Sequence, residues 1–151
     1  MMRTLLAVDT SAGTSVAIVR GGVILAEKST DEIRRHAEVV GHMLAECLSE
    51  AGLTPADITD VVAGRGPGPF TGLRVGISFA HTFGLARNIP VIGVCSLDAI
   101  EVDAVEYTVA IDARRKEIYW AKYRDGVRIE GPSVNKPDEV SDFIIDRYPS
   151  V

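Results

Sequence analysis

Residues 64–76 read GRGPGPFTGLRVG, a glycine- and proline-rich run that follows a short apolar segment and opens a helical pattern. Glycines permit positive φ angles and close backbone approach, and the two prolines stiffen the loop. Thr71 is expected to cap the helix, whose first amides could then receive an anion. The alternative is a rigid turn in which Gly72 and Gly76 allow tight packing. No Gly-Lys-Ser/Thr follows, so the run is not a P-loop, and it is not a dinucleotide fingerprint.

The segments on either side of this run alternate between strand and helix patterns. The order predicts an α/β protein with a mixed sheet, because the early hairpins favour antiparallel pairing and the later strand–helix–strand unit favours parallel pairing. A ribonuclease-H-like fold uses a sheet of this kind. The predicted strands are residues 3–8, 15–20, 23–28, 59–63 and 91–94, and the predicted helices are residues 31–51 and about 71–86.

The second part of the chain repeats the opening pattern of strands and hairpins and then stops early. Strands are predicted at 107–112, 117–123 and 127–130, with a turn at Asp125-Gly126. A last helix is expected over 138–147, with Val140, Phe143 and Ile144 on its apolar side. We therefore expect one full lobe at 1–100 and a short second lobe at 101–151.

The composition favours a soluble, cytoplasmic protein. The formal net charge is −5, so the chain lacks the overall basic character of a protein that grips nucleic acid unaided. Cys47 and Cys95 lie far apart and are expected to be reduced and buried. The apolar opening is interrupted by Asp9, unlike a signal peptide, and no segment approaches the length of a membrane span.

Three stretches of the sequence resemble the TsaB (YeaZ) family of the actin-like ATPase (ASKHA) superfamily. They are LAVDTS at 6–11, GPGPFTGLRVG at 66–76 and IDARRKEIY at 111–119, and they span nearly the whole chain in the family's order. Pro69 departs from the pattern, because serine is usual there. Full members of the family extend beyond residue 151, so the chain resembles a short or truncated member.

The resemblance implies a non-catalytic role in tRNA modification. The chain would pair with the catalytic paralogue TsaD, which transfers threonylcarbamoyl to adenosine 37 of ANN-decoding tRNA, and a TsaE-like ATPase would join the complex. The tRNA would be contacted only indirectly, and the chain alone is expected to form a homodimer. No cofactor or metal is expected on this chain. The expected partner interface on the two helices is His36, Val39, Met43, Arg74, Ser78, His81 and Leu85.

The same resemblance implies vestigial phosphate loops, and these keep one alternative function open. The loop residues are Asp9, Thr10, Ser11, Gly66, Gly68, Thr71, Gly72 and Asp112. An actin-like enzyme that binds and hydrolyses ATP alone would use Asp9 and Asp112. Against this alternative, no glycine-rich adenosine clamp follows Asp112, since the remaining glycines lie in predicted turns.

Hydrolase and metal chemistry have little support in the sequence. His36, His42 and His81 do not share a metal-binding helix spacing, and exposed or capping histidines are expected. Ser78 falls inside a helix rather than on a nucleophile elbow, which argues against the family's old glycoprotease label. The TsaD metal histidines are missing at 95–100, which reads CSLDAI.

Overall fold

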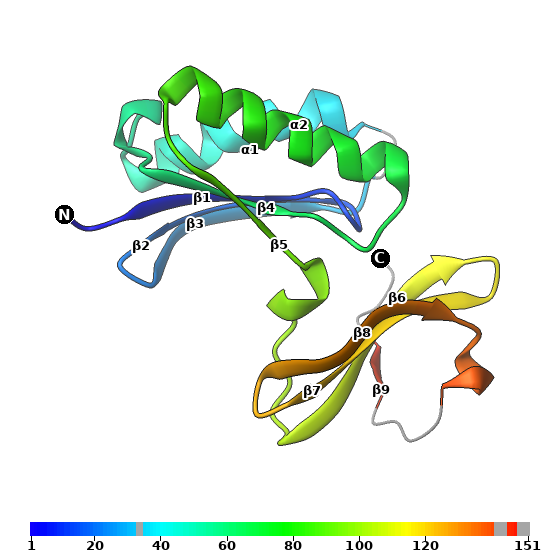
Figure 1. The fold of residues 1–151 in the computed structure, drawn as a ribbon. Coiled ribbons are helices and arrows are strands. Elements are labelled where there is room, and N and C mark those ends of the chain that lie inside the picture. Colours follow the sequence, from blue (N-terminus) through cyan, green and yellow to red (C-terminus); the bar gives the residue numbers. More distant parts are fainter. Residues whose placement is uncertain (33–34, 141–144, 148–151) are drawn as a thin grey trace. The chain divides into compact units, whose positions relative to one another are not determined.

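A computed structural model describes residues 1–32, 35–140 and 145–147, with side chains described through residue 140 (Figure 1). The chain divides into two compact units, Met1–Val94 and Cys95–Val151, so the boundary lies a few residues before the expected one at residue 100. Each unit has its own sheet.

The first unit is built on a five-stranded mixed sheet. Its strand order is β3-β2-β1-β4-β5, in which β1 is parallel to β4 and β4 to β5, while β1–β2 and β2–β3 are antiparallel. Gly21 and Gly22 both have positive φ angles of 58° and 81°, as a tight hairpin turn between β2 and β3 requires. The strands are β1 (Thr4–Asp9), β2 (Thr14–Arg20), β3 (Val23–Thr30), β4 (Asp60–Gly64) and β5 (Val91–Val94).

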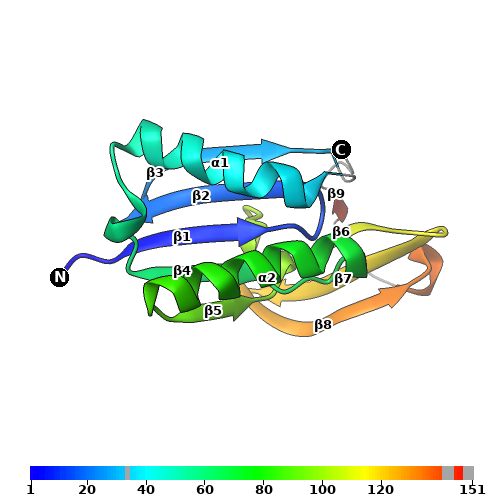
Figure 2. The same ribbon diagram turned by 90° about the horizontal axis from the view of Figure 1, so that it is seen from above.

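Two helices cover one face of this sheet, as Figure 2 shows from above. Helix α1 (His36–Ala51) packs on β2 and β3, and α2 (Phe70–Arg87) packs on β4 and β1. Both helices end on a left-handed residue, Gly52 and Asn88, which turns the chain back toward the sheet. A short 3-10 turn, η1 (Pro55–Asp57), lies between α1 and β4.

Helix α1 begins at His36, later than the expected residue 31. Residues 31, 32 and 35 are not helical, and residues 33–34 lie outside the described residues. The apolar spacing continues upstream of His36, but Thr30 still pairs with Thr14 at the end of the β2–β3 ladder. The β2–β3 ladder therefore ends at Thr30, and α1 starts only at His36.

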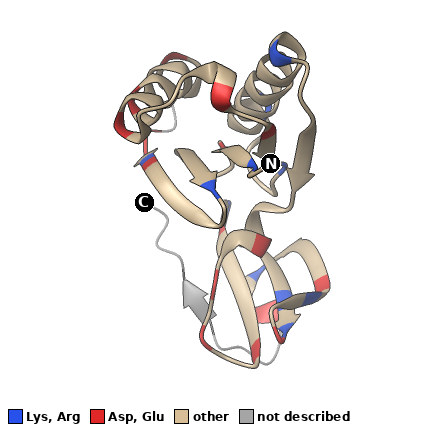
Figure 3. Cartoon of the chain, turned by 90° about the vertical axis from the view of Figure 1, so that its left-hand side faces the viewer, with Lys and Arg blue, Asp and Glu red and all other residues tan. Residues whose placement is uncertain are grey.

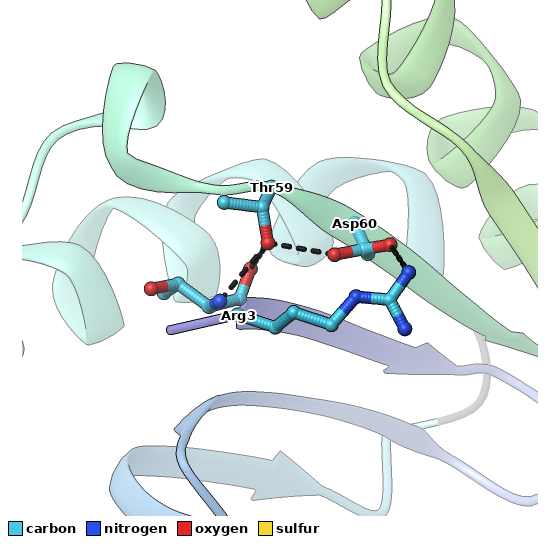
Figure 4. A network of polar contacts seen from close by, with 4 residues as sticks. Arg3, Thr59 and Asp60 are labelled. Atoms are coloured by element: carbon cyan, nitrogen blue, oxygen red, sulfur yellow. Dashed lines mark hydrogen bonds and ion pairs between the residues drawn. The ribbon is translucent and has the colours of Figure 1, made fainter. Parts of the chain in front are cut away.

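The amino-terminal ends of β1 and β4 are joined by a polar network (Figure 4). The Arg3 guanidinium donates to Asp60 Oδ1 at 2.7 Å, and the Thr59 hydroxyl donates to Asp60 Oδ2 at 2.6 Å. Thr4 N in turn donates to Thr59 Oγ1 at 3.0 Å. Asp60 is only 2% exposed, so these donors stabilise a buried carboxylate and hold the two parallel strands in register.

The second unit is a four-stranded sheet in the order β8-β7-β6-β9. Strands β6 (Glu106–Arg114), β7 (Glu117–Arg124) and β8 (Val127–Asn135) form an antiparallel meander, and β9 (Ile145–Arg147) runs parallel to β6. Tyr107 and Tyr123 stack with ring centroids 5.1 Å apart in a core that also contains Cys95 and Leu97. The connector from β5 includes one 3-10 turn, η2 (Ser96–Ala99).

The expected helix over 138–147 is wrong in the described part. Pro137–Glu139 forms a 3-10 turn, η3, and Ile145–Arg147 is a strand. Residues 141–144, including Phe143 and Ile144, lie outside the described residues. Ile145 pairs with Thr108 on β6, so hydrogen bonding to a neighbouring strand overrides the local helical spacing.

Candidate functional site

The sequence-predicted loops of the first unit meet at the carboxyl ends of two parallel strands. Val8 of β1 is paired with Ala63 of β4, so Asp9 and Gly64 leave the sheet side by side. This edge of an α/β sheet is where ligand sites usually form. A Cβ on Gly64 would collide with the Asp9 carboxylate, which shows how closely the two loops approach.

Asp9 and Ser11 form a compact turn at this edge. Asp9 Oδ1 accepts hydrogen bonds from Ser11 N at 2.7 Å and from the Ser11 hydroxyl at 2.5 Å. The carboxylate is thus held by its own loop, and Ser11 is buried. A hydrogen bond from a backbone N–H to the Asp side chain two residues earlier is common in turns.

Thr10 joins this turn to helix α2. Its hydroxyl donates to Gly72 O at 2.6 Å and accepts from Gly76 N at 2.9 Å, so it bridges two backbone groups four residues apart on the helix. Thr10 is 1% exposed. A buried hydroxyl with both partners in place fixes the start of α2 against the end of β1.

The glycine-rich loop lies directly on the Thr10–Ser11 backbone. A Cβ on Gly68 would meet Ser11 O at 2.7 Å, and a Cβ on Gly72 would meet His36 Nε2 at 2.7 Å. The structure therefore brings the first-unit loop residues together, and the hydrogen bonds of the Asp9 and Thr10 side chains lie within this cluster and the start of α2. The arrangement supports a rigid turn, as the packing interpretation of the sequence predicts.

Two predicted loop residues are placed differently. Thr71 does not cap α2, because the helix begins at Phe70 after Pro69, with no side-chain cap, and Thr71 is exposed. Asp112 belongs to β6 in the second unit, where its Oδ1 accepts from Arg114 N at 3.0 Å. It supports the β6–β7 hairpin.

Helix α2 approaches the sheet through small residues. Its buried positions recur every four residues and are Gly72, Gly76, Ala80 and Gly84. Helical spacing predicts a core face of Leu73, Ile77, Ala80 and Gly84. Ala80 and Gly84 are buried, whereas Leu73 and Ile77 are only half-buried. Glycine lacks a Cβ, so close backbone approach decides which face is buried, and the larger side chains lie on either side.

A shallow apolar groove runs between α1 and α2 on their outer side, away from the sheet. Its volume is about 390 Å³. Phe70 and Leu85 of α2 are 78% and 84% exposed, and the Arg74 guanidinium lies 5.6 Å from the centre of the Phe70 ring. The groove is lined by Ala37, Val40, Arg74, Val75, Ser78 and Phe79.

The predicted partner residues divide between this outer surface and the core. Those of α2 are exposed, namely Arg74, Ser78, His81 and Leu85.

On α1, Met43 is 7% exposed and belongs to the core, and Val39 is half-buried against the same core. The expectation of an exposed or capping His36 is also wrong. It is 7% exposed, and its Nδ1 hydrogen-bonds the Thr14 hydroxyl at 2.7 Å.

Two exposed residues near the helix surfaces were not among the predicted partner residues. Ala37 is exposed and lines the groove, and Phe70, the largest side chain of its motif, is exposed on the first turn of α2. The four-residue repeat of small residues on α2 was the available signal. A glycine stripe facing the sheet places Phe70 and Leu85 on the solvent side.

Neither a metal-ligand cluster nor a membrane-spanning helix is found among the described residues. No group of three or more His, Cys, Asp or Glu side chains among them could hold a metal ion. In the same part of the chain, no helix has the length and apolar character needed to cross a membrane. His42 is exposed and contacts Glu46 through Nε2 at 2.9 Å. Figure 3 shows acidic and basic positions interspersed along both units.

Two buried side chains have shifted pKa values, and both lie in the cores. Burial raises the pKa of the Cys47 thiol, which lies on the buried, sheet-facing side of α1. Burial and then the hydrogen bond to Asp98 raise the pKa of the Tyr123 hydroxyl well above its ordinary value. Tyr123 donates to Asp98 Oδ1 at 2.8 Å, so the protonated phenol is the form that the second unit stabilises.

Known proteins are similar to this chain in both sequence and fold. Residues 23–149 match the family described as TsaD: tRNA N6-adenosine threonylcarbamoyltransferase. The chain is 35% identical over 127 residues to the tRNA threonylcarbamoyladenosine biosynthesis protein TsaB of Escherichia coli, covering 80% of this chain and 54% of that protein. The chain therefore spans about half the length of that relative.

Solved structures show the same similarity to this group of proteins. The chain superposes on YeaZ from Pseudomonas aeruginosa with a TM-score of 0.82 and 32% identity, covering 93% of this chain and 70% of that one. The Lmo2764 protein of Listeria monocytogenes shares the fold alone, with a TM-score of 0.51 and 12% identity over 85% of this chain and 50% of that one. The predicted ribonuclease-H-like, actin-like mixed α/β fold is confirmed.

Proposed function

Because this chain belongs to the TsaB (YeaZ) group of the TsaD family and so to tRNA threonylcarbamoyladenosine biosynthesis, we propose that it is a non-catalytic scaffold subunit. In this proposal it pairs in the cytoplasm with the catalytic TsaD paralogue and holds that enzyme in an active arrangement. A TsaE-like ATPase joins the complex, and the chain alone forms a homodimer.

The observation that carries this proposal is the apolar groove between α1 and α2. A protein–protein interface needs exposed apolar anchors and a pocket that partner side chains can fill. Phe70 and Leu85 provide such anchors on α2, and the groove beside them is walled by Val75 and Phe79. Arg74 adds a cation whose guanidinium lies over the Phe70 ring.

The Thr10 bridge supports the same role. It ties the first turns of α2 to the end of β1, so the outer face of α2 is held in a fixed position on the sheet. A preorganised docking face loses less conformational freedom on binding than a mobile one. The glycine-rich loop then acts by positioning a helix, and no reaction step is assigned to it.

A charge placed in the groove tests the proposal. Ser78→Glu puts a carboxylate on an exposed groove position, and pairing would take this charge out of water, which is costly even beside Arg74 four residues earlier on α2. We expect the affinity for the TsaD paralogue, measured by calorimetry or biolayer interferometry, to fall at least about thirtyfold. Circular dichroism should be unchanged, because Ser78 is exposed in the free chain.

Ser49→Glu is the matched control, since Ser49 is exposed on α1 and does not line the groove. We expect it to change the affinity less than twofold. Equal affinities for the two variants would show that pairing uses another surface. If the unaltered chain does not bind the paralogue at all, the scaffold proposal is wrong.

A further inference from the structure

The hairpin between β6 and β7 carries three consecutive cations, Arg114, Arg115 and Lys116, which we call the basic tip. All three are exposed. They outnumber the two flanking carboxylates, Asp112 and Glu117. Within the described residues, none of the three cations lies within ion-pair distance of a carboxylate.

The cations on the described side chains of β7 and β8 behave differently. Lys122 pairs with Glu130 at 3.5 Å, Arg124 with Glu106 at 2.7 Å, and Arg128 with Asp98 at 3.2 Å. Carboxylates therefore neutralise the described cations along β7 and β8, whereas the three cations of the basic tip have no carboxylate partner among the described residues. Three consecutive cations without such a pairing lie at one end of the sheet, in a chain whose net charge is −5.

The backbone of the basic tip is unfavourable for the residues that occupy it. Arg114, Arg115 and Lys116 have φ angles of 64°, 52° and 63°, in the left-handed region that favours glycine and asparagine. Arg114 pairs with Glu117, so Arg115 and Lys116 form the two-residue turn. Such turns strongly prefer Asn-Gly or Gly-Gly, whose backbones reach these angles without strain.

Two other hairpins of this chain follow that preference. The β2–β3 turn is Gly21-Gly22 and the β7–β8 turn is Asp125-Gly126, each with positive φ at both positions. The basic tip departs from it at every position. A strained turn that keeps long cationic side chains is typical of a functional contact, because local stability alone favours other residues there.

We propose that the basic tip binds phosphate groups of RNA. Arginine and lysine neutralise phosphates well when fully exposed, and such contacts position a nucleic acid without reading its sequence. Apolar anchors are needed for a protein partner and not for phosphate, and residues 113–117 include no large apolar side chain. The inference rests on the proposed function for the identity of the RNA as tRNA, and it adds a direct contact to an otherwise acidic chain.

The test exchanges the tip for an ideal turn. Arg115→Asn with Lys116→Gly removes two charges and installs the Asn-Gly sequence that this conformation favours. Fluorescence anisotropy measures binding of the full chain to an unmodified, labelled tRNA transcript from 50 to 200 mM salt. We expect the Kd to rise about tenfold and the slope of log K against log[salt] to become shallower by about 1.8, since two phosphate contacts are lost.

The control removes the same charge elsewhere. Arg124→Gln with Arg128→Gln lies at the other end of β7, and we expect less than a twofold change in Kd. Thermal unfolding of the Asn-Gly variant should occur at the same or a higher temperature, which excludes misfolding as the cause of weaker binding.

The inference is overturned if both double variants weaken RNA binding equally, or if neither does. It is also overturned if the tip binds polyglutamate while the Asn-Gly variant keeps full tRNA affinity, because that result identifies an acidic protein partner. Pairing with the TsaD paralogue is measured in parallel. If the unaltered chain binds the paralogue and the Asn-Gly variant binds RNA as well as the unaltered chain does, only this inference fails. If the unaltered chain does not bind the paralogue, the proposed function fails.

Discussion

Replacing Gly76 with alanine should destabilise the first unit, although alanine is the better helix former. A Cβ at this position would lie 2.5 Å from Thr10 Oγ1 and 3.0 Å from Thr10 Cγ2, well inside van der Waals contact. Thr10 cannot move away freely, because its hydroxyl bridges Gly72 O and Gly76 N. The new methyl group therefore meets a buried and hydrogen-bonded side chain.

The expected magnitude is a balance of three effects. Helix propensity favours alanine by about 0.5–1 kcal/mol. Overpacking in a filled site costs about 1–3 kcal/mol, and the loss of a buried hydrogen bond costs about 1 kcal/mol more. The free energy of unfolding should therefore fall by about 2 kcal/mol in Gly76→Ala.

Gly41→Ala is the matched control, because Gly41 is an exposed residue of α1 with open space around its Cβ position. Here only propensity acts, and we expect a gain of about 0.5–1 kcal/mol. Chemical denaturation followed by circular dichroism at 222 nm reports the first unit, which contains both described α-helices. If Gly76→Ala stabilises the chain as much as Gly41→Ala does, the tight packing of α2 on Thr10 is wrong.

Two further predictions concern the cores. Because the folded protein raises the pKa of the Tyr123 hydroxyl above its ordinary value of 10.0, the unfolded chain loses that proton first as the pH rises. The free energy of unfolding of the second unit should fall above pH 10 by up to about 1.4 kcal/mol per pH unit, whereas it is unaffected by this group at neutral pH. Fluorescence of Trp120, the single tryptophan, reports the unfolding of this unit. Tyr123→Phe should make the unfolding free energy depend less on pH above pH 10, and an unchanged dependence would show that Tyr123 is not the group responsible. Cys47 and Cys95 are 0% and 3% exposed, one in each unit, and should resist a thiol reagent such as dithiobisnitrobenzoate until their own unit unfolds. Fast modification of either thiol in the folded chain would show that its core opens readily.

The order of elements was predictable because each depends on local chemistry. The Gly21-Gly22 pair specifies a tight hairpin turn, Gly52 ends α1, and the run at 64–76 separates a strand from a helix. Most predicted strands agree with the structure to within a residue or two. The helix expected over 138–147 failed because a short segment near Ile145 pairs with β6, an interaction that local spacing does not contain.

The candidate site was predictable only in part, for a related reason. Hydrophobic spacing favoured a core face of α2 that contains Leu73 and Ile77 as well as Ala80 and Gly84, and it favoured an exposed Met43 on α1. The structure buries Met43 and turns a glycine stripe toward the sheet. Spacing identifies which residues share a helix face, but the closeness of helix and sheet determines which face is buried.

The sequence by itself determined the family, the alternation of strands and helices and the glycine-rich turn, because these depend on residues near one another in the chain. Only the tertiary structure decided that Thr10 fastens α2 through its backbone, that His36 is buried against Gly72, and that an apolar groove remains between the helices. Those features join residues as much as 66 positions apart. Their physical basis is the absent Cβ of glycine, which lets a helix backbone come within hydrogen-bonding distance of a strand end and leaves its larger side chains facing outward.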